Sequence, residues 1–115
     1  MSKQFKLESS QIRPLVYGYG SCIASDHITV EGKPVGYMYR EASDNGADSG
    51  WRFFSGMESQ AYADNPDNFS IYDVNTIANY DPSVIPLLDA APGSAWGKDA
   101  SGQFVEEATP IDPDA

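Results

Sequence analysis

The sequence predicts an α+β protein with a mostly antiparallel sheet of short strands and two or three short helices. Strand-like runs rich in Val, Ile and aromatic residues are short, helix signals are brief, and 10 Gly and 8 Pro in 115 residues separate them frequently. This mixture is typical of α+β architecture. The length fits one domain, expected over residues 14–107, with an N-terminal lead-in over 1–13 and a disordered acidic tail over 108–115.

The first predicted elements are the lead-in and a short strand. Pro14 stops any helix that begins within the lead-in, because proline breaks a helix interior. Residues 22–24 predict a strand, and residues 25–27 predict a turn or a short irregular segment. A further turn signal over residues 31–34 leads into the next strand.

The strongest local signal is an antiparallel hairpin formed by residues 35–40 and 51–54. Both runs are rich in residues of high β-propensity. Alternate side chains of a strand share a face, which pairs Tyr37 with Tyr39, Met38 with Arg40, Trp51 with Phe53, and Arg52 with Phe54. The hairpin is therefore expected to carry an aromatic ladder, in which each cross-strand pair contributes about 0.2–1 kcal/mol.

The middle of the chain predicts one short helix and one strand. Residues 57–63 favour a helix, which Pro66 breaks. Residues 68–78 contain alternating apolar positions and are interpreted as a strand or as a strand followed by a turn.

The last third of the chain predicts a helix and a second hairpin. Asp81, followed by proline, is a favourable N-cap for a short helix over residues 83–90, in which an internal proline is expected to cause a kink. Residues 94–98 and 103–106 predict the last two strands, joined by the turn over 99–102.

Charge is distributed unevenly along the chain. Residues 1–40 carry a formal charge of +2 and residues 41–115 one of −12, for a net charge of −10. Nucleic-acid binding requires clustered Lys and Arg, so the sequence argues against it. An acidic surface favours solubility alone or, alternatively, rapid encounter with a basic partner. No apolar run approaches the ~18 residues of a membrane span and no secretion signal is visible, so we expect a cytoplasmic protein that does not bind membranes.

Residues suited to catalysis or metal binding are few. The chain has one Cys and one His, whereas a zinc site needs about four such ligands. Cys22 and His27 would face opposite sides of a regular strand, so no nucleophile pair is expected. The acidic loop before Trp51 lacks the ligand spacing of an EF-hand. The sequence therefore predicts no catalytic residue, no metal site and no cofactor, and it sets no oligomeric state.

The loop of the first hairpin contains the candidate partner-binding residues. Arg40 and Arg52 flank this loop and are expected to lie near each other. Arg52 is expected to pair with a carboxylate (Glu41, Asp48 or Asp73), either as a structural ion pair or as part of a partner contact. Trp51 is interpreted as a core anchor or as a binding hot spot. The candidates are Arg40, Glu41, Asp44, Asp48, Trp51 and Arg52.

Four motifs within residues 20–98 stand out: Gly-Tyr-Met-Tyr-Arg-Glu over 36–41, Asp-Ser-Gly-Trp-Arg-Phe-Phe-Ser-Gly over 48–56, the Asp81 helix start, and Gly-Ser-Ala-Trp over 93–96. Together they resemble the immunity protein 33 family of bacterial polymorphic-toxin systems, also described as a domain of unknown function. The resemblance implies a cytoplasmic, non-catalytic α+β protein that neutralises a toxin by binding it. The family's motif positions in this chain are Arg40, Glu41, Asp48, Ser49, Gly50, Trp51, Arg52, Asp81 and Pro82.

Two alternatives stand beside an immunity protein that binds a cognate, basic toxin. The first is an orphan regulatory or structural protein. The second is a small-ligand protein or enzyme with a concave carboxylate–arginine pocket. That pocket would be built from Arg40, Glu41, Asp48 and Arg52. A structure in which these side chains merely pair with one another on a convex surface would contradict it.

Overall fold

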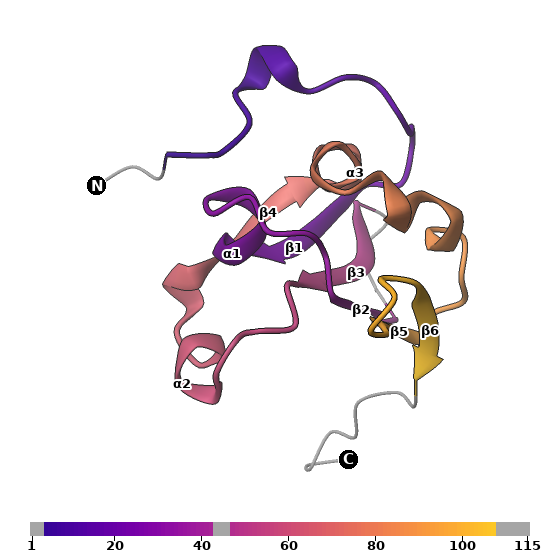
Figure 1. Cartoon of the computed structure of the whole chain (residues 1–115). Coiled ribbons are helices and arrows are strands. Elements are labelled where there is room, and N and C mark those ends of the chain that lie inside the picture. The colour runs from indigo at the N-terminus through magenta and orange to yellow at the C-terminus, as the bar shows by residue number, and fades with distance from the viewer. Residues whose placement is uncertain (1–3, 43–46, 108–115) are drawn as a thin grey trace.

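The computed structural model describes residues 4–42 and 47–107, whose strands form one sheet (Figure 1). The strand order in the sheet is β4-β1-β3-β2-β5-β6. Strands β1 and β3 pair in parallel, and the other four pairings are antiparallel, which confirms the predicted class. The strands are β1 (Ser21–Ser25), β2 (Tyr37–Arg40), β3 (Asp48–Phe54), β4 (Phe69–Asp73), β5 (Ala95–Lys98) and β6 (Phe104–Glu107).

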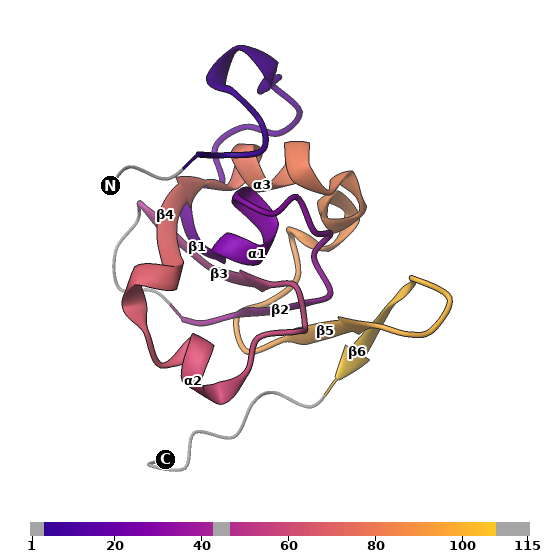
Figure 2. The same cartoon turned by 60° about the vertical axis from the view of Figure 1, so that its left-hand side comes forward.

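Six short helices accompany this sheet in the described residues. They are the α-helices α1 (Asp26–Thr29), α2 (Gln60–Ala63) and α3 (Val74–Tyr80), and the 3-10 helices η1 (Ser9–Gln11), η2 (Pro66–Asn68) and η3 (Pro82–Leu87). Helices α1, α3 and η3 bury apolar side chains in the core. Helix α2 buries none, and it lies at the end of the molecule remote from α3 in both views (Figure 1, Figure 2). We call the sheet face opposite the core the open face.

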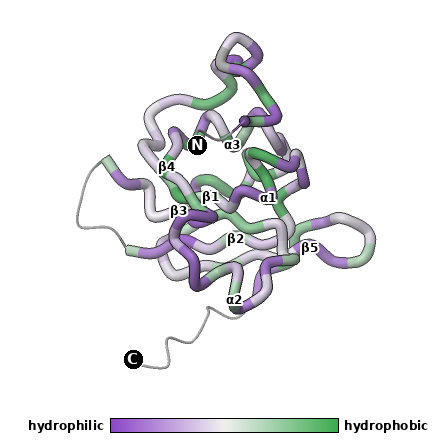
Figure 3. Tube along the Cα trace, turned by 90° about the vertical axis from the view of Figure 1, so that its left-hand side faces the viewer, coloured by the Kyte–Doolittle hydropathy of each residue, from purple (hydrophilic) through white to green (hydrophobic). Residues whose placement is uncertain are grey.

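The hydrophobic core lies between the sheet and helices α1, α3 and η3. Met38 on β2 and Trp51 and Phe53 on β3 are fully buried together with Ile28 and Ile77 from the helices. Hydrophobic stretches of β1 and α1 accordingly lie in the interior of the trace in Figure 3. Side chains between these core positions point to the open face, because successive strand residues alternate.

The register of the first hairpin confirms the predicted aromatic ladder. Tyr37 lies opposite Phe54, and Tyr39 lies opposite Arg52. The rings of Tyr39 and Phe54 stack with their centroids 5.8 Å apart. The second hairpin, β5 with β6, is also confirmed.

The turn predicted over residues 25–27 is wrong, because this segment begins helix α1. Ser25 is fully buried and caps the helix by accepting a hydrogen bond from the backbone N–H of His27 at 3.1 Å. His27 is therefore a helix residue, not a turn residue.

The second half of the strand predicted over residues 68–78 is also wrong, because it forms helix α3. Asp73 caps this helix by accepting from the N–H of Asn75 at 2.9 Å. Val74, Ile77 and Ala78 then lie on one helical face and are fully buried. Capping and packing thus outweigh the strand preference of this segment.

Two further helices differ from their predictions mainly in extent. Helix α2 begins at Gln60, three residues later than expected, because Ser59 is its N-cap. Asp81 is the predicted N-cap, accepting from the N–H of Ser83 at 3.1 Å, but the helix it opens is the 3-10 helix η3.

The lead-in packs against α3 through side-chain amides. Asn75 accepts hydrogen bonds from the backbone N–H groups of Leu15 and Val16, and its amide donates to the Arg13 carbonyl at 2.9 Å. Asn79 binds the backbone of Arg13 in the same way. The N-terminal segment therefore lies on the α3 side of the molecule, away from the open face (Figure 1).

Candidate partner-binding site

Glu41, Asp48 and Arg52 form an ion-pair cluster at the loop end of the first hairpin, which we call the crest. The Arg52 guanidinium donates to both carboxylate oxygens of Asp48 at 3.0 and 2.9 Å and to Glu41 at 3.2 Å. The predicted pairing of Arg52 with a carboxylate is confirmed, and it involves two of the three expected acids. Two carboxylates on one guanidinium leave the crest with a formal charge of −1.

The pairing also favours the charged forms of Asp48 and Arg52. Hydrogen bonds from Arg52 hold the pKa of Asp48 below its ordinary value, and hydrogen bonds to Asp48 raise the pKa of Arg52. The Arg52 side chain is only 12% exposed, whereas that of Glu41 is 50% exposed. A partner that approaches the crest therefore meets the negative charge of Glu41 first.

Arg40 and Trp51 lie on the core side of the hairpin, away from the crest. Arg40 donates to the carbonyls of Ser49 at 2.9 Å and Ala90 at 2.7 Å, and its guanidinium lies 5.7 Å from the centre of the Trp51 ring. Trp51 has no exposed surface, and its indole N–H donates to the Leu88 carbonyl at 3.1 Å. These two residues hold the hairpin to the core, and the fully buried Trp51 is a core anchor.

The two hairpin arginines do not form one site. Arg40 lies opposite the buried Trp51 and Arg52 lies opposite Tyr39, so their side chains occupy opposite faces. The structure does not bring the four residues of the alternative pocket together, because Arg52, Asp48 and Glu41 bind one another while Arg40 binds carbonyls elsewhere. The remaining candidate, Asp44, lies outside the described residues.

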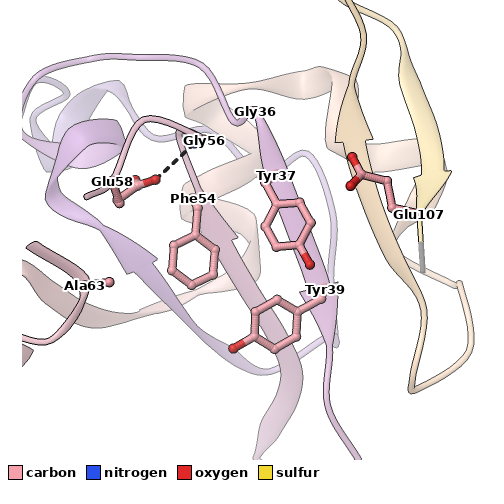
Figure 4. A pocket seen from close by; sticks show the side chains of 8 residues that line it. All are labelled: Gly36, Tyr37, Tyr39, Phe54, Gly56, Glu58, Ala63 and Glu107. Atoms are coloured by element: carbon pink, nitrogen blue, oxygen red, sulfur yellow. Dashed lines mark hydrogen bonds between the residues drawn. The ribbon is translucent and has the colours of Figure 1, made fainter. Parts of the chain in front are cut away.

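The open face contains a hollow of about 470 Å³ between α2 and β6, which we call the tyrosine hollow (Figure 4). Three partly exposed rings form its floor, with centroid separations of 6.0 Å for Tyr37 and Tyr39, 6.1 Å for Tyr37 and Phe54, and 5.8 Å for Tyr39 and Phe54. Burial raises the pKa of both tyrosines, so the phenols stay neutral and keep their O–H donors. The lining residues are Gly36, Tyr37, Tyr39, Phe54, Gly56, Glu58, Ala63 and Glu107.

Two carboxylates border the tyrosine hollow on opposite sides (Figure 4). Glu58 accepts hydrogen bonds from the backbone N–H groups of Ser55 and Gly56 at 2.8 and 3.0 Å and from the Ser55 hydroxyl at 2.9 Å. Burial alone would raise its pKa, but these hydrogen bonds outweigh that effect and lower it. Glu107 lies on the exposed edge strand, and its charge is a secondary cause, after burial, of the raised pKa of Tyr37.

Two further hollows continue along the open face. One of about 560 Å³ adjoins α2 and includes Asp64 and Ile71, and one of about 190 Å³ lies beside the crest and includes Asp48, Arg52 and Ile71. The three hollows together are lined by four carboxylates and one guanidinium, which is itself paired. The open face is therefore apolar along its floor and acidic at its margins.

His27, Ser55 and Glu58 form a polar cluster next to the tyrosine hollow that the sequence did not suggest. The Ser55 hydroxyl lies 2.9 Å from His27 Nδ1, but it donates its proton to Glu58 and accepts from the N–H of Met57. A serine nucleophile would need to give its proton to the imidazole. The cluster instead fastens the loop that forms one wall of the hollow.

Cys22 is likewise unsuited to nucleophilic chemistry. The side chain is 1% exposed, and burial raises the pKa of its thiol. Because the thiolate is the reactive form, this cysteine behaves as a small apolar core residue.

The sequence predicts that Tyr37, Tyr39 and Phe54 belong to the aromatic ladder of the hairpin. It does not predict that this ladder forms the floor of a hollow. Alternation of the strands was the available signal for the rings. Glu58 and Glu107 are separated from Tyr37 by 21 and 70 positions in the chain. Only the three-dimensional pairing of β2 with β5, and of β5 with β6, brings Glu107 to this site.

Within residues 4–42 and 47–107, no group of three or more His, Cys, Asp and Glu side chains has a geometry that would hold a metal ion. No helix in the same residues is both long and apolar enough to cross a bilayer.

The fold and the site define a small α+β protein with an acid-bordered, aromatic open face. Residues 22–108 match the family described as the Immunity protein Imm33 domain. This match covers most of the chain and both the crest and the tyrosine hollow, so the protein belongs to the Imm33 family of immunity proteins, as its motifs indicate. Comparisons with curated proteins and with solved structures give no match.

Proposed function

We propose that this protein is a cytoplasmic immunity protein that neutralises a cognate toxin by binding it directly through the open face. Membership of the Imm33 family supports the immunity role. One observation carries the choice of surface: the open face keeps apolar side chains in solvent, including Ile71, which is 73% exposed. Exposed apolar surface with a polar margin is characteristic of protein interfaces.

Charge indicates the chemistry of the toxin. The margins of the open face carry an excess of carboxylates, and Arg52, the basic residue among those that line its hollows, is already paired with Asp48 and Glu41. A basic surface, such as the substrate-binding cleft of a nuclease, is complementary to such a face. Covering that cleft would block substrate access, and this requires no bond-making by the immunity protein itself.

The proposal is tested with the toxin encoded by the neighbouring gene. Ile71→Lys places a positive charge on the edge strand β4, where Ile71 lines two of the three hollows of the open face. We expect it to weaken toxin binding at least tenfold and to abolish protection of cells that express the toxin, because a hot-spot disruption of about 2 kcal/mol has this effect. Isothermal titration calorimetry and a growth assay measure the two outcomes.

The matched control is Tyr17→Lys. Tyr17 is 78% exposed and lies just beyond the stretch that packs on α3, outside the open face. This variant should bind and protect like the natural protein. The proposal fails if the natural protein does not bind the toxin, or if Tyr17→Lys weakens binding as much as Ile71→Lys does.

A further inference from the structure

The tyrosine hollow presents aromatic faces and hydroxyl groups to solvent without an internal partner. Its three rings lie about 6 Å from one another and are only partly buried. In the described part of the chain, neither the Tyr37 hydroxyl nor the Tyr39 hydroxyl makes a hydrogen bond. Figure 4 shows the three rings side by side, with Glu58 and Ala63 beyond Phe54 and with Glu107 beyond Tyr37.

Glu107 is held over the sheet by the absence of a side chain at Gly97. The two residues lie two register positions apart on one face of the β5–β6 hairpin, and a Cβ at Gly97 would collide with the Glu107 carboxylate. This carboxylate has no ion-pair or hydrogen-bond partner among residues 4–42 and 47–107. An unpaired anion therefore borders an aromatic floor, and Glu58 supplies a second, fixed anion across it.

No lysine or arginine in the described chain neutralises this site. None of the six Lys and Arg residues within residues 4–42 and 47–107 lines the tyrosine hollow. The three with the most defined partners are engaged elsewhere: Arg52 at the crest, Arg40 on backbone carbonyls and Lys98 with Asp81 at 2.6 Å. A cation is the ligand that is complementary to aromatic faces beside an unpaired carboxylate.

We propose that the tyrosine hollow binds a basic side chain, arginine or lysine, of the partner protein. The cation lies on the faces of Tyr37, Tyr39 and Phe54, and its N–H groups donate to Glu107. An apolar side chain would leave the Glu107 carboxylate unpaired, and an acidic one would be repelled by both glutamates. The inference rests on the proposed function only in naming the toxin as the source of this side chain.

The binding chemistry is tested without the toxin, by NMR on protein with labelled aromatic rings. The titrants are N-acetyl-arginine methylamide and its neutral isostere, N-acetyl-citrulline methylamide. We expect the ring signals of Tyr37, Tyr39 and Phe54 to shift with the arginine compound, with an apparent affinity about tenfold higher than for the citrulline compound, as cation–π and charge contributions of this size imply. Equal affinities, or shifts confined to other residues, would overturn the assignment.

Two variants take the Glu107 carboxylate charge away from the hollow in different ways. Glu107→Gln removes the charge, and Gly97→Ala displaces the carboxylate while retaining it, because the added methyl group occupies its position. Each is expected to weaken arginine binding about fivefold. Glu106→Gln is the matched control, because Glu106 is the adjacent strand residue and faces the other side. It should leave binding unchanged, and thermal melting verifies that all three variants fold.

The two proposals fail separately. If the ring signals shift with the arginine compound but the protein binds no toxin, the cation site is supported and the immunity function is refuted. A protein that binds toxin, but whose ring signals do not respond to the arginine compound, refutes the cation site and leaves the open face as the docking surface.

Discussion

At the scale of single residues, Asp81 shows how this acidic chain keeps a charge inside its fold. The residue is 8% exposed. One carboxylate oxygen accepts from the Val35 backbone N–H at 3.0 Å and from Lys98 at 2.6 Å, and the other accepts from Ser83. Burial alone would raise the pKa of Asp81, but the hydrogen bonds from Lys98 and Ser83 outweigh it and lower the pKa. Asp81 thereby joins η3, β5 and the segment before β2.

We predict that Asp81→Asn lowers the free energy of unfolding by about 3 kcal/mol at pH 7, because it leaves Lys98 without its partner in a poorly solvated site. The loss should depend on pH. A carboxyl with a lowered folded-state pKa stabilises the fold above its unfolded pKa, near 3.8, and this contribution disappears as pH falls through the lower folded value. Urea unfolding between pH 7 and pH 2 measures the difference between the two proteins.

Glu106→Gln serves as the control for this experiment, since Glu106 is an exposed acid. Its unfolding free energy should stay within about 0.5 kcal/mol of the natural value, as is usual for surface substitutions. A constant difference between Asp81→Asn and the natural protein across the whole pH range would contradict the role assigned to the Asp81 carboxylate.

At the scale of elements, Gly50 determines how the crest end of the β2–β3 hairpin is built. Its φ of +87° lies in the left-handed region, and a Cβ there would collide with the Glu41 carbonyl. The two residues are also joined by a hydrogen bond from the Glu41 backbone N–H to the Gly50 carbonyl at 2.8 Å. The close approach of these strands positions Glu41 beside Arg52.

We predict that Gly50→Ala lowers the free energy of unfolding by about 3 kcal/mol, of which 1–2 kcal/mol is the left-handed backbone and the rest is the collision. Gly18→Ala separates the two contributions, because Gly18 has a φ of +76° and open space around its Cβ position. Gly18→Ala should lower stability by only about 1 kcal/mol. Chemical denaturation measures both variants, and equal losses would show that the approach to Glu41 is unimportant.

The elements also show which parts of the fold are predictable from sequence. The hairpin could be predicted because aromatic and β-branched residues alternate along both strands, and the Arg52 ion pair because few other cations lie near so many acids. Helix α3 was missed because Val74, Thr76 and Ile77 favour strands, although Asp73 as a cap and the spacing of its buried residues were readable. The tyrosine hollow could not be predicted, since it depends on long-range pairing that places Glu107 beside β2.

At the scale of the whole molecule, the negative charge and the open face act together. The net charge is −10, and the three hollows on the open face are lined by four acids. The lead-in, with Lys6 and Arg13, packs on the α3 side instead. On the proposed function, this distribution of charge would attract a basic protein over a long range and direct it to the open face, where apolar contacts would then hold it.

We predict that the association rate constant for the toxin falls about tenfold between 20 mM and 500 mM salt, while the dissociation rate constant changes little, because screening acts on long-range steering more than on contacts already formed. Stopped-flow fluorescence of Trp51 and Trp96 or of a labelled toxin measures both constants.

Glu41→Gln should reduce the association rate constant and its salt dependence, since Glu41 is the most exposed charge of the crest. Glu8→Gln removes the same charge from the lead-in and should have a smaller effect. Equal effects of the two substitutions would mean that net charge, and not the acidic margin of the open face, determines the encounter.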